Sequence, residues 1–251
     1  MTPNPDATFK ALRAFNDPAL APLAGLTGRI DLRALAWFPS DTLLDKLGRA
    51  LAERRALNVK ELFESFEFFE RVRRRLRAPH VADLCCGHGL TGLLFATFER
   101  EVQTVTLLDH ARPESYDVVL DAIASVAPWV PGKVRFLERR VQGCAAVLEP
   151  GTRVIAVHAC GARTDRVLDV AIALGTDAAV MPCCYAHTAD DAPRALRDAL
   201  GPAVATDIHR TYRLEAAGYR VDWTAIPSVI TDMHRVLIAT RPAGPTMDIA
   251  R

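Results

Sequence analysis

The sequence predicts an α/β fold with a mostly parallel sheet and a helical extension in front of it. Short apolar segments alternate with helix-period segments from Val81 onward, which is the pattern of βαβ units. The stretch Val81–Gly89 reads V-A-D-L-C-C-G-H-G and leads into an apolar helical segment, so its order is strand, glycine turn, helix. The residues in front of Val81 show helical spacing only, and we expect them to add helices rather than a second sheet.

The first 28 residues contain four prolines and two glycines. We expect little regular structure there beyond a short helix at Ala7–Phe15, and we interpret the segment as an arm or a disordered tail. The next segment, Asp41–Glu53, has leucines at helical spacing. This pattern predicts a helix with Ser40 or Asp41 as its N-cap.

A second and stronger helix is expected at Val59–Leu76. Its apolar stripe consists of Leu62, Phe63, Phe66, Phe69, Val72 and Leu76. We interpret the aromatic residues as core packing rather than as substrate contacts. Five arginines lie toward the end of this helix, namely Arg71, Arg73, Arg74, Arg75 and Arg77. Cations suit that end of a helix dipole, and a solvated basic face is favoured over an RNA contact.

The strands and helices of the sheet region can be placed from the change of period. Strands are expected at Val81–Leu84, Thr104–Leu108, Val134–Leu137, Arg153–His158, Ala178–Met181, Arg220–Ala225 and Arg235–Ala239. Helices are expected at Leu90–Phe98, Tyr116–Val126, Ala145–Val147, Asp165–Leu174, Ala192–Leu200 and His209–Ala217. Thr164 is the expected N-cap of the helix after the fourth strand.

The glycine turn indicates a site for a nucleotide-type cofactor. Glycine allows the backbone to approach a ligand and to adopt positive φ, and the helix N-terminus behind the turn offers free N–H groups. Thr104–Asp109 reads as a second buried strand that ends in an acid. It lies about one βα unit, roughly 20 residues, after the turn, where a ribose-binding carboxylate belongs. The alternative is a tight βα turn without any ligand.

The pair of motifs D-L-x-C-G-x-G and a strand ending in Asp109 resembles the class I S-adenosylmethionine (SAM)-dependent methyltransferases. The resemblance implies a Rossmann-like sheet of order 3-2-1-4-5-7-6 with the seventh strand antiparallel. It implies that Gly87 and Gly89 pass under the methionine part of SAM and that Asp109 binds the ribose hydroxyls. Cys85 occupies the first glycine position of the family's motif. The implied cofactor-binding residues are Asp83, Cys85, Cys86, Gly87, Gly89, Asp109, Gln142 and His158.

Gln142 belongs to this set because of its position just after the third strand. Many class I enzymes have an acid there that contacts adenine, whereas this chain reads E-R-R-V-Q at Glu138–Gln142. We therefore expect backbone and apolar contacts to adenine, with Gln142 as a candidate. The chain also lacks the N/D-P-P-Y motif after the fourth strand, so methylation of an amino group on a base or a glutamine gains no support.

Three strands are followed by turns that contain cysteine. Cys85 and Cys86 come after the first strand, H-A-C-G at His158–Gly161 after the fourth, and M-P-C-C-Y at Met181–Tyr185 after the fifth. Because parallel strands ~4.8 Å apart bring their ends together, we expect one pocket lined by Cys86, His158, Cys160, Cys183, Cys184 and Tyr185. This pocket is where we expect the methyl group to be transferred.

The motifs H-x-C-G-x-x-T-D and C-C-Y indicate which branch of the methyltransferases this chain resembles. They resemble the branch that holds the tRNA acceptor-stem 2′-O-methyltransferases, the methyltransferase-like 25 type proteins and the C-terminal domain of the glutathione S-transferase C-terminal-domain-containing protein. The resemblance covers roughly Val81 to Tyr185. The tRNA enzymes begin with cysteine/histidine zinc modules, whereas this chain has no cysteine before Cys85.

The candidate catalytic residues each have a second interpretation. His158 is a candidate general base because its pKa is naturally near neutral, or it orients the turn through hydrogen bonds. Cys183 and Cys184 are candidate nucleophiles, metal ligands or small buried residues. Tyr185 is a candidate for stacking on or binding the acceptor. Asp165 is interpreted as a helix cap near the SAM carboxylate.

Composition sets the remaining expectations. The 251 residues are 50% hydrophobic and 24% charged, with a formal net charge of +1, which neither demands nor excludes nucleic acid. No apolar run reaches the length of a membrane span, and the N-terminus lacks signal-peptide features. We expect a cytoplasmic protein with reduced cysteines, no disulfide and no bound metal. The domains are expected to be a helical arm and lid at 1–78 and a methyltransferase domain at 79–251.

Three functions are compatible with these observations. The leading hypothesis is a SAM-dependent methyltransferase that acts on an RNA hydroxyl, a small molecule or a protein group. The alternative is a metal-binding or redox protein on a methyltransferase-like fold, with ligands from Cys86, His158, Cys160, Cys183 and Cys184. A third hypothesis is a non-catalytic SAM-binding partner subunit. The sequence leaves the acceptor and the oligomeric state open.

Overall fold

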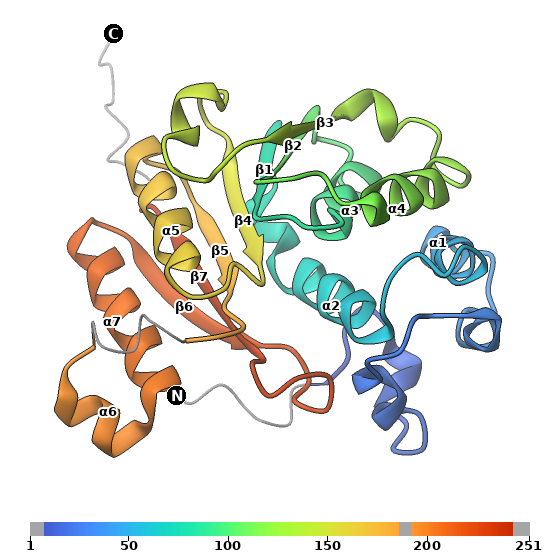
Figure 1. Ribbon diagram of the computed structural model, residues 1–251, viewed down its shortest axis with the longest axis horizontal. Coiled ribbons are helices and arrows are strands. Elements are labelled where there is room, and N and C mark those ends of the chain that lie inside the picture. The colour runs from blue at the N-terminus through green and yellow to red at the C-terminus, as the bar shows by residue number, and fades with distance from the viewer. Residues whose placement is uncertain (1–7, 186–191, 243–251) are drawn as a thin grey trace, which may run out of the picture.

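The computed structural model describes residues 8–185 and 192–242, and it contains one seven-stranded sheet. The strand order is β3-β2-β1-β4-β5-β7-β6, and β7 runs antiparallel to both of its neighbours (Figure 1). The strands are β1 (His80–Leu84), β2 (Thr104–Asp109), β3 (Val134–Glu138), β4 (Arg153–Val157), β5 (Ala178–Met181), β6 (Arg220–Ala225) and β7 (Arg235–Thr240). The predicted fold class, strand order and strand positions are therefore confirmed.

Helices cover both faces of this sheet. They are α1 (Leu43–Glu53), α2 (Val59–Leu76), α3 (Leu90–Phe98), α4 (Glu114–Ala124), α5 (Ala162–Leu174), α6 (Arg194–Leu200) and α7 (Pro202–Ala216). Successive strand residues point to opposite faces, and the core divides accordingly. Val81 and Ile155 belong to the hydrophobic cluster with α1–α4. Ala82 and Val154 belong to the cluster with α5 and α7.

Two predicted helix starts differ from the structure by three residues or more. The helix after β4 begins at Ala162, next to Gly161, and Thr164 is not its N-cap. The Thr164 hydroxyl instead donates to the carbonyl of Ala159, because it already lies inside the first turn. The last helix begins at Pro202 rather than His209. Proline is well suited to the first helical position, where its missing N–H costs nothing.

The N-terminal segment forms part of the core, so the expectation of an unstructured arm is wrong for residues 8–28. Three short 3₁₀ helices lie at Arg13–Asn16, Ala21–Gly25 and Leu32–Trp37. The predicted α-helix at Ala7–Phe15 is replaced by the first of these, and Ala7 itself lies outside the described residues. Pro18 and Pro22 interrupt the chain after this segment, and its aromatic residues pack into the core, with the Phe15 and Phe63 ring centroids 4.5 Å apart.

Helix α1 begins at Leu43, two residues later than the predicted start at Asp41. Its N-cap is Thr42 rather than Ser40 or Asp41. The Thr42 hydroxyl oxygen accepts from the backbone N–H of Asp45 at 3.3 Å. The Ser40 hydroxyl lies 2.9 Å from the Thr42 hydroxyl, so Ser40 supports the cap and does not form it.

Helix α2 has the predicted bounds, and its apolar stripe is buried as predicted. The Phe69 ring packs against Phe95 of α3, with centroids 5.0 Å apart. The predicted solvated basic face holds for Arg74, Arg75 and Arg77, which are exposed. It is wrong for Arg71, whose side chain is 1% exposed and pairs with Glu67. Arg73 and Arg77 both bind the buried carboxylate of Glu99, each at 2.6 Å. Arg75 binds Asp222 of β6 at 2.6 Å.

Candidate functional site

Two adjoining cavities lie beyond the carboxyl ends of β1, β2 and β4. Their volumes are about 220 and 210 Å³, and both are lined by Cys85, Asp109, His110 and Arg163. Strand β1 lies between β2 and β4, where the strand order reverses. Open α/β sheets bind their ligands at this switch point. We refer to the two spaces as the glycine-turn cavity and the arginine-lined cavity.

The glycine turn leaves room for a ligand at one of its two glycines. Gly87 has a φ of +51°, and a Cβ added there would meet nothing within 4 Å, so its backbone faces the open glycine-turn cavity. Gly89 has a φ of +74°, and its added Cβ would lie 2.8 Å from Leu107. Gly89 is therefore needed for packing, and it does not line the cavity.

Cys85, at the first glycine position of the motif, adopts a backbone conformation with positive φ that is usual for glycine. Its φ is +61°, a region in which a side chain is strained. Its side chain lines both cavities, and Cys86 lines the glycine-turn cavity. Burial raises the pKa of the Cys85 thiol to about 12 and also raises the pKa of Cys86. Both side chains are therefore neutral thiols at physiological pH.

Asp109 lies where the two cavities meet. One carboxylate oxygen accepts from the backbone N–H of Gly87 at 2.9 Å. The other accepts from the backbone N–H of His110 at 2.7 Å. These bonds fix the carboxylate at the end of β2, next to the glycine turn. Its side chain is 14% exposed, so it keeps access to a ligand.

Asp83 forms the floor of the glycine-turn cavity. Its Oδ2 accepts from the backbone N–H of Gly92 at 2.8 Å, which ties β1 to α3. Burial raises the pKa of Asp83 to about 7, because it outweighs the hydrogen bond from Gly92. Perturbed carboxyl groups of this kind are found preferentially at functional sites.

His158 lines the glycine-turn cavity and is held by a buried acid from α2. Its Nε2 lies 2.7 Å from Oε2 of Glu64, whose side chain is 1% exposed. His158 has a φ of +63°, and this unusual backbone conformation aims the ring at α2. The predicted hydrogen-bonded histidine is therefore present. Its role as a general base stays a prediction.

Sequence reasoning missed the contribution of α2 to this cavity. Glu61 and Ser65 line it, and Glu64 lies beneath His158. Their spacing of three and four residues places them on one helical face, which was the available signal. His88 of the glycine turn was also missed. Its Nε2 lies 3.8 Å from Glu61, and burial lowers its pKa.

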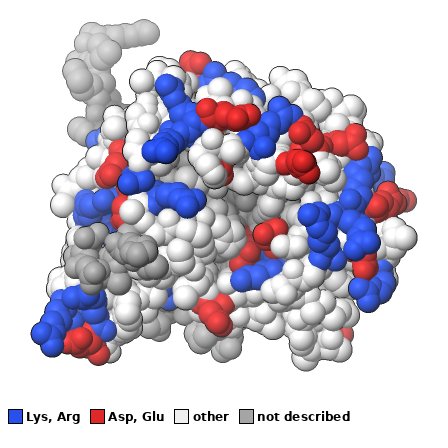
Figure 2. Space-filling model, in the orientation of Figure 1, with Lys and Arg blue, Asp and Glu red and all other residues white. Residues whose placement is uncertain are grey.

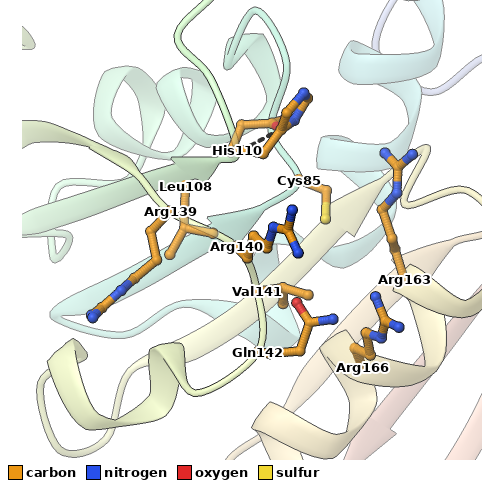
Figure 3. Close-up of a pocket in the computed structure, with 10 residues that line it drawn as sticks. Cys85, Leu108, His110, Arg139, Arg140, Val141, Gln142, Arg163 and Arg166 are labelled. Atoms are coloured by element: carbon orange, nitrogen blue, oxygen red, sulfur yellow. Dashed lines mark hydrogen bonds and ion pairs between the residues drawn. The ribbon is translucent and has the colours of Figure 1, made fainter.

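The arginine-lined cavity is bounded by the loop after β3 and the start of α5 (Figure 3). Leu108 and Val141 supply its apolar surface, and Gln142 lies beside them. With its amide oxygen toward Arg166, Gln142 accepts from the guanidinium Nε at 3.0 Å. The remaining arginines that line this cavity are Arg139, Arg140 and Arg163.

The other predicted pocket residues lie outside both cavities. The sulfur atoms of Cys160, Cys183 and Cys184 form a cluster of their own, within 4.8 Å of one another. Tyr185 is buried, and its hydroxyl donates to Asp207 of α7 at 2.7 Å. Of the six residues predicted to share a pocket, Cys86 and His158 line the glycine-turn cavity, and the common pocket for all six stays a prediction. The end of β5 is one strand further from β1, and Tyr185 turns toward α7.

Comparison with known proteins gives a family. Residues 54–191, more than half of the chain, match the family described as "Methyltransferase domain". The chain belongs to this methyltransferase family. The family match thus begins just after α1 and covers both cavities and the cysteine cluster. A comparison with curated proteins gives no match.

Solved structures with a similar fold are distant in sequence. A protein from Corynebacterium glutamicum aligns with a TM-score of 0.52 and 15% identity, covering 85% of this chain and 97% of that one. A putative rRNA-methylase from Clostridium thermocellum aligns with a TM-score of 0.50 and 11% identity, covering 70% and 94%. These similarities support the fold. No helix in the described part of the chain has the length and apolar character needed to span a membrane.

Proposed function

We propose that this methyltransferase uses SAM and that the cofactor lies across both cavities with its ribose on Asp109. The observation that carries the proposal is the position of Asp109, which borders both cavities at the switch point of the sheet. Ribose hydroxyls are hydrogen-bond donors, and an acid at the end of the second strand is the group that binds them in folds of this type.

The glycine-turn cavity suits the polar methionine part of SAM, and the arginine-lined cavity suits the adenine ring. Gly87 and Asp83 in the glycine-turn cavity would hold the methionine part, where the open space at Gly87 permits a close backbone approach. Leu108 and Val141 in the arginine-lined cavity offer apolar contacts to adenine, with Gln142 as a polar partner. When bound, SAM supplies an electrophilic methyl group on its sulfonium. The protein supplies orientation and a place for the acceptor.

His158 lines the glycine-turn cavity, and the buried Glu64 holds its imidazole from behind. We propose that His158 positions the acceptor and accepts its proton, and that Glu64 orients the imidazole. Catalytic roles for Cys183, Cys184 and Tyr185 remain predictions, because none of the three lines either cavity.

An RNA hydroxyl is the acceptor that we favour, on the H-A-C-G and P-C-C-Y motifs that resemble the tRNA 2′-O-methyltransferase branch. Arg139, Arg140, Arg163 and Arg166 border the arginine-lined cavity, and none of them forms an ion pair with an acid in the described ranges 8–185 and 192–242. Phosphate contacts need guanidinium groups without an acidic partner, and of these four the Arg166 group donates to the neutral amide oxygen of Gln142. The face in Figure 2 carries basic and acidic groups side by side, so the contact would be local.

The domain division is also a proposal. We propose that the N-terminal region 1–78, whose residues 8–28 pack into the core, acts as a lid on the methyltransferase domain at 79–251. Glu61 and Ser65 of α2 line the glycine-turn cavity, which supports a covering role. Helix α2 shares its hydrophobic cluster with α3, so this lid is a fixed wall of the site. Cytoplasmic localisation remains a prediction.

The proposed function can be tested by methyl transfer from labelled SAM to total small RNA. The wild-type chain is expected to label RNA, whereas His158→Ala is expected to lower the rate by about 10²-fold or more, the contribution of a positioned base. Calorimetric SAM affinity should fall much less than the rate, because the proposed role of His158 is toward the acceptor. His80→Ala is the matched control, because His80 bonds Thr104 at the opposite end of β1. If SAM binds but RNA is not labelled, the acceptor is a protein or a small molecule rather than RNA. If the protein does not bind SAM, the proposed function is refuted.

The raised pKa of Asp83 predicts a pH dependence of SAM binding. The carboxyl group is ionised above about pH 7 and protonated below it. SAM is a cation at its sulfonium and ammonium groups, so SAM would favour the ionised form and displace the proton. We therefore expect affinity to fall below pH 7, by up to about tenfold per pH unit. Asp83→Asn should bind more weakly at pH 8 and show a flatter profile. If SAM affinity depends on pH in the same way in the wild type and in Asp83→Asn, Asp83 is not the group that controls binding.

A further inference from the structure

Three thiols converge at a place separate from the two cavities. Cys160 lies in the turn after β4, and Cys183 and Cys184 lie in the turn after β5. The sulfur atoms of all three lie within 4.8 Å of one another, and those of Cys160 and Cys183 are 2.7 Å apart. All three residues are half-buried, so the cluster can be reached by a small ion.

The backbone holds the two turns in register. The N–H of His158 donates to Met181 at 3.1 Å, and the N–H of Gly161 donates to Cys184 at 3.2 Å. These bonds extend the pairing of β4 and β5 beyond the strand ends. Gly161 has φ +61° and ψ −137°, a conformation open essentially to glycine. The convergence of the sulfur atoms is therefore enforced by the backbone and does not depend on long flexible side chains.

We propose that Cys160, Cys183 and Cys184 form a three-thiolate site for a thiophilic d¹⁰ metal ion, Zn²⁺ or Cu⁺. Soft thiolates select these ions over harder cations. Two sulfur ligands on a tetrahedral ion at about 2.3 Å lie about 3.8 Å apart. The pair at 2.7 Å must therefore open by about 1 Å, and the 4.8 Å limit on the other pairs is compatible with this spacing. Each thiol loses its proton to solvent when its sulfur–metal bond forms.

The sequence offered five possible metal ligands, and the structure brings three of them, the cysteines of the cluster, together. His158 is engaged with Glu64, and Cys86 lines the glycine-turn cavity, so neither belongs to the cluster. The sequence led us to expect no bound metal, because it shows neither an acid nor a closed set of ligands among these residues. The three cysteines come from two turns about one βα unit apart, and only the β4–β5 pairing brings them together.

The test uses the full chain purified under reductant and freed of metal. Titration with Co²⁺ is expected to produce a sulfur-to-metal charge-transfer band in the near ultraviolet. Separate loading with Zn²⁺ and with Cu⁺, followed by gel filtration and elemental analysis, distinguishes the two ions at one equivalent per chain. Cys160→Ser and Cys183→Ser should weaken binding by at least about tenfold. Cys144→Ala is the matched control, because Cys144 lies in the core cluster near α5 and should bind as the wild type does.

Three results would overturn the proposal. The first is the absence of a charge-transfer band when the wild-type chain is titrated with Co²⁺. The second is an unchanged band in both the Cys160→Ser and the Cys183→Ser variant. The third is a Cys160–Cys183 disulfide that forms in the reduced preparation, seen as the loss of two thiol hydrogens by mass spectrometry. If the serine variants do not fold, alkylation of the wild type decides. Metal should then protect the three cluster cysteines, and equal labelling with and without metal would refute the site.

Discussion

Replacement of Glu67 by alanine is expected to lower the free energy of unfolding by about 3–5 kcal/mol, the cost of breaking a buried ion pair from one side. The Glu67 side chain is fully buried and pairs with Arg71, whose side chain is 1% exposed. Its carboxylate also accepts from the backbone N–H groups of Lys10, Ala11 and Leu12. The variant would leave three amides without their acceptor and the buried Arg71 without its counter-charge, with backbone carbonyls such as those of Thr8 and Ala225 still bonded to it. Equilibrium unfolding in urea measures the change.

Glu70→Ala is the control for this prediction. Glu70 lies on the same helix and pairs with Arg73 at 3.1 Å, with both side chains partly exposed. Exposed pairs contribute about 0–1 kcal/mol, so this variant should change stability little. A loss of similar size in both variants would show that Glu67 does not anchor the N-terminal segment. Glu67→Gln, which keeps an acceptor but no charge, should fall between wild type and Glu67→Ala.

Replacement of Asp109 by alanine is expected to weaken SAM binding by roughly 1.5–3 kcal/mol, the value of a hydrogen bond to a charged group. This corresponds to an affinity loss of about 10- to 150-fold. The variant removes the proposed ribose acceptor and also the acceptor for the Gly87 N–H. Both effects act in the same direction, because the turn that would hold the methionine part loses its support. Isothermal titration calorimetry with SAM and S-adenosylhomocysteine gives the measurement.

Asp117→Ala is the matched control for Asp109. Asp117 lies on α4, is exposed and pairs with Arg112, and it lines neither cavity. Its replacement should leave affinity unchanged. Equal affinity in wild type and Asp109→Ala would place the ribose elsewhere. If Asp109→Ala binds SAM as the wild type does and still transfers methyl groups, only the ribose assignment is wrong. If methyl transfer is absent from the wild type as well, the proposed function itself is wrong.

Part of the site could be predicted because its residues lie near strand ends. Asp109 and Gly87 were placed from local pattern alone, and the structure joins them by a hydrogen bond. Parallel strands bring their carboxyl ends to one edge, so a residue just after a strand is located by its sequence position. His158 was placed at the same edge for the same reason, and it lines the glycine-turn cavity.

The partners of these residues could not be predicted in the same way. Glu64 meets His158 across 94 residues of chain, and its helical spacing with Glu61 and Ser65 gives a shared face but not the partner that the face meets. The same holds for Glu67, whose three amide donors belong to a segment that reads as a proline-rich arm. Tyr185 was expected at the acceptor, but Asp207 of α7 holds its hydroxyl instead.

The sequence by itself determined the strands, the glycine turn and the position of Asp109, because period-two and helical spacing are local properties that arise from backbone geometry. Only the tertiary structure decided which charges are buried, where the N-terminal segment packs and which cysteines meet. These outcomes depend on contacts between distant segments, in which a buried charge needs a partner and an apolar face needs a neighbour. Cys160 and Cys183 illustrate the difference, since each lies in a predictable turn and only the pairing of β4 with β5 brings their sulfur atoms together.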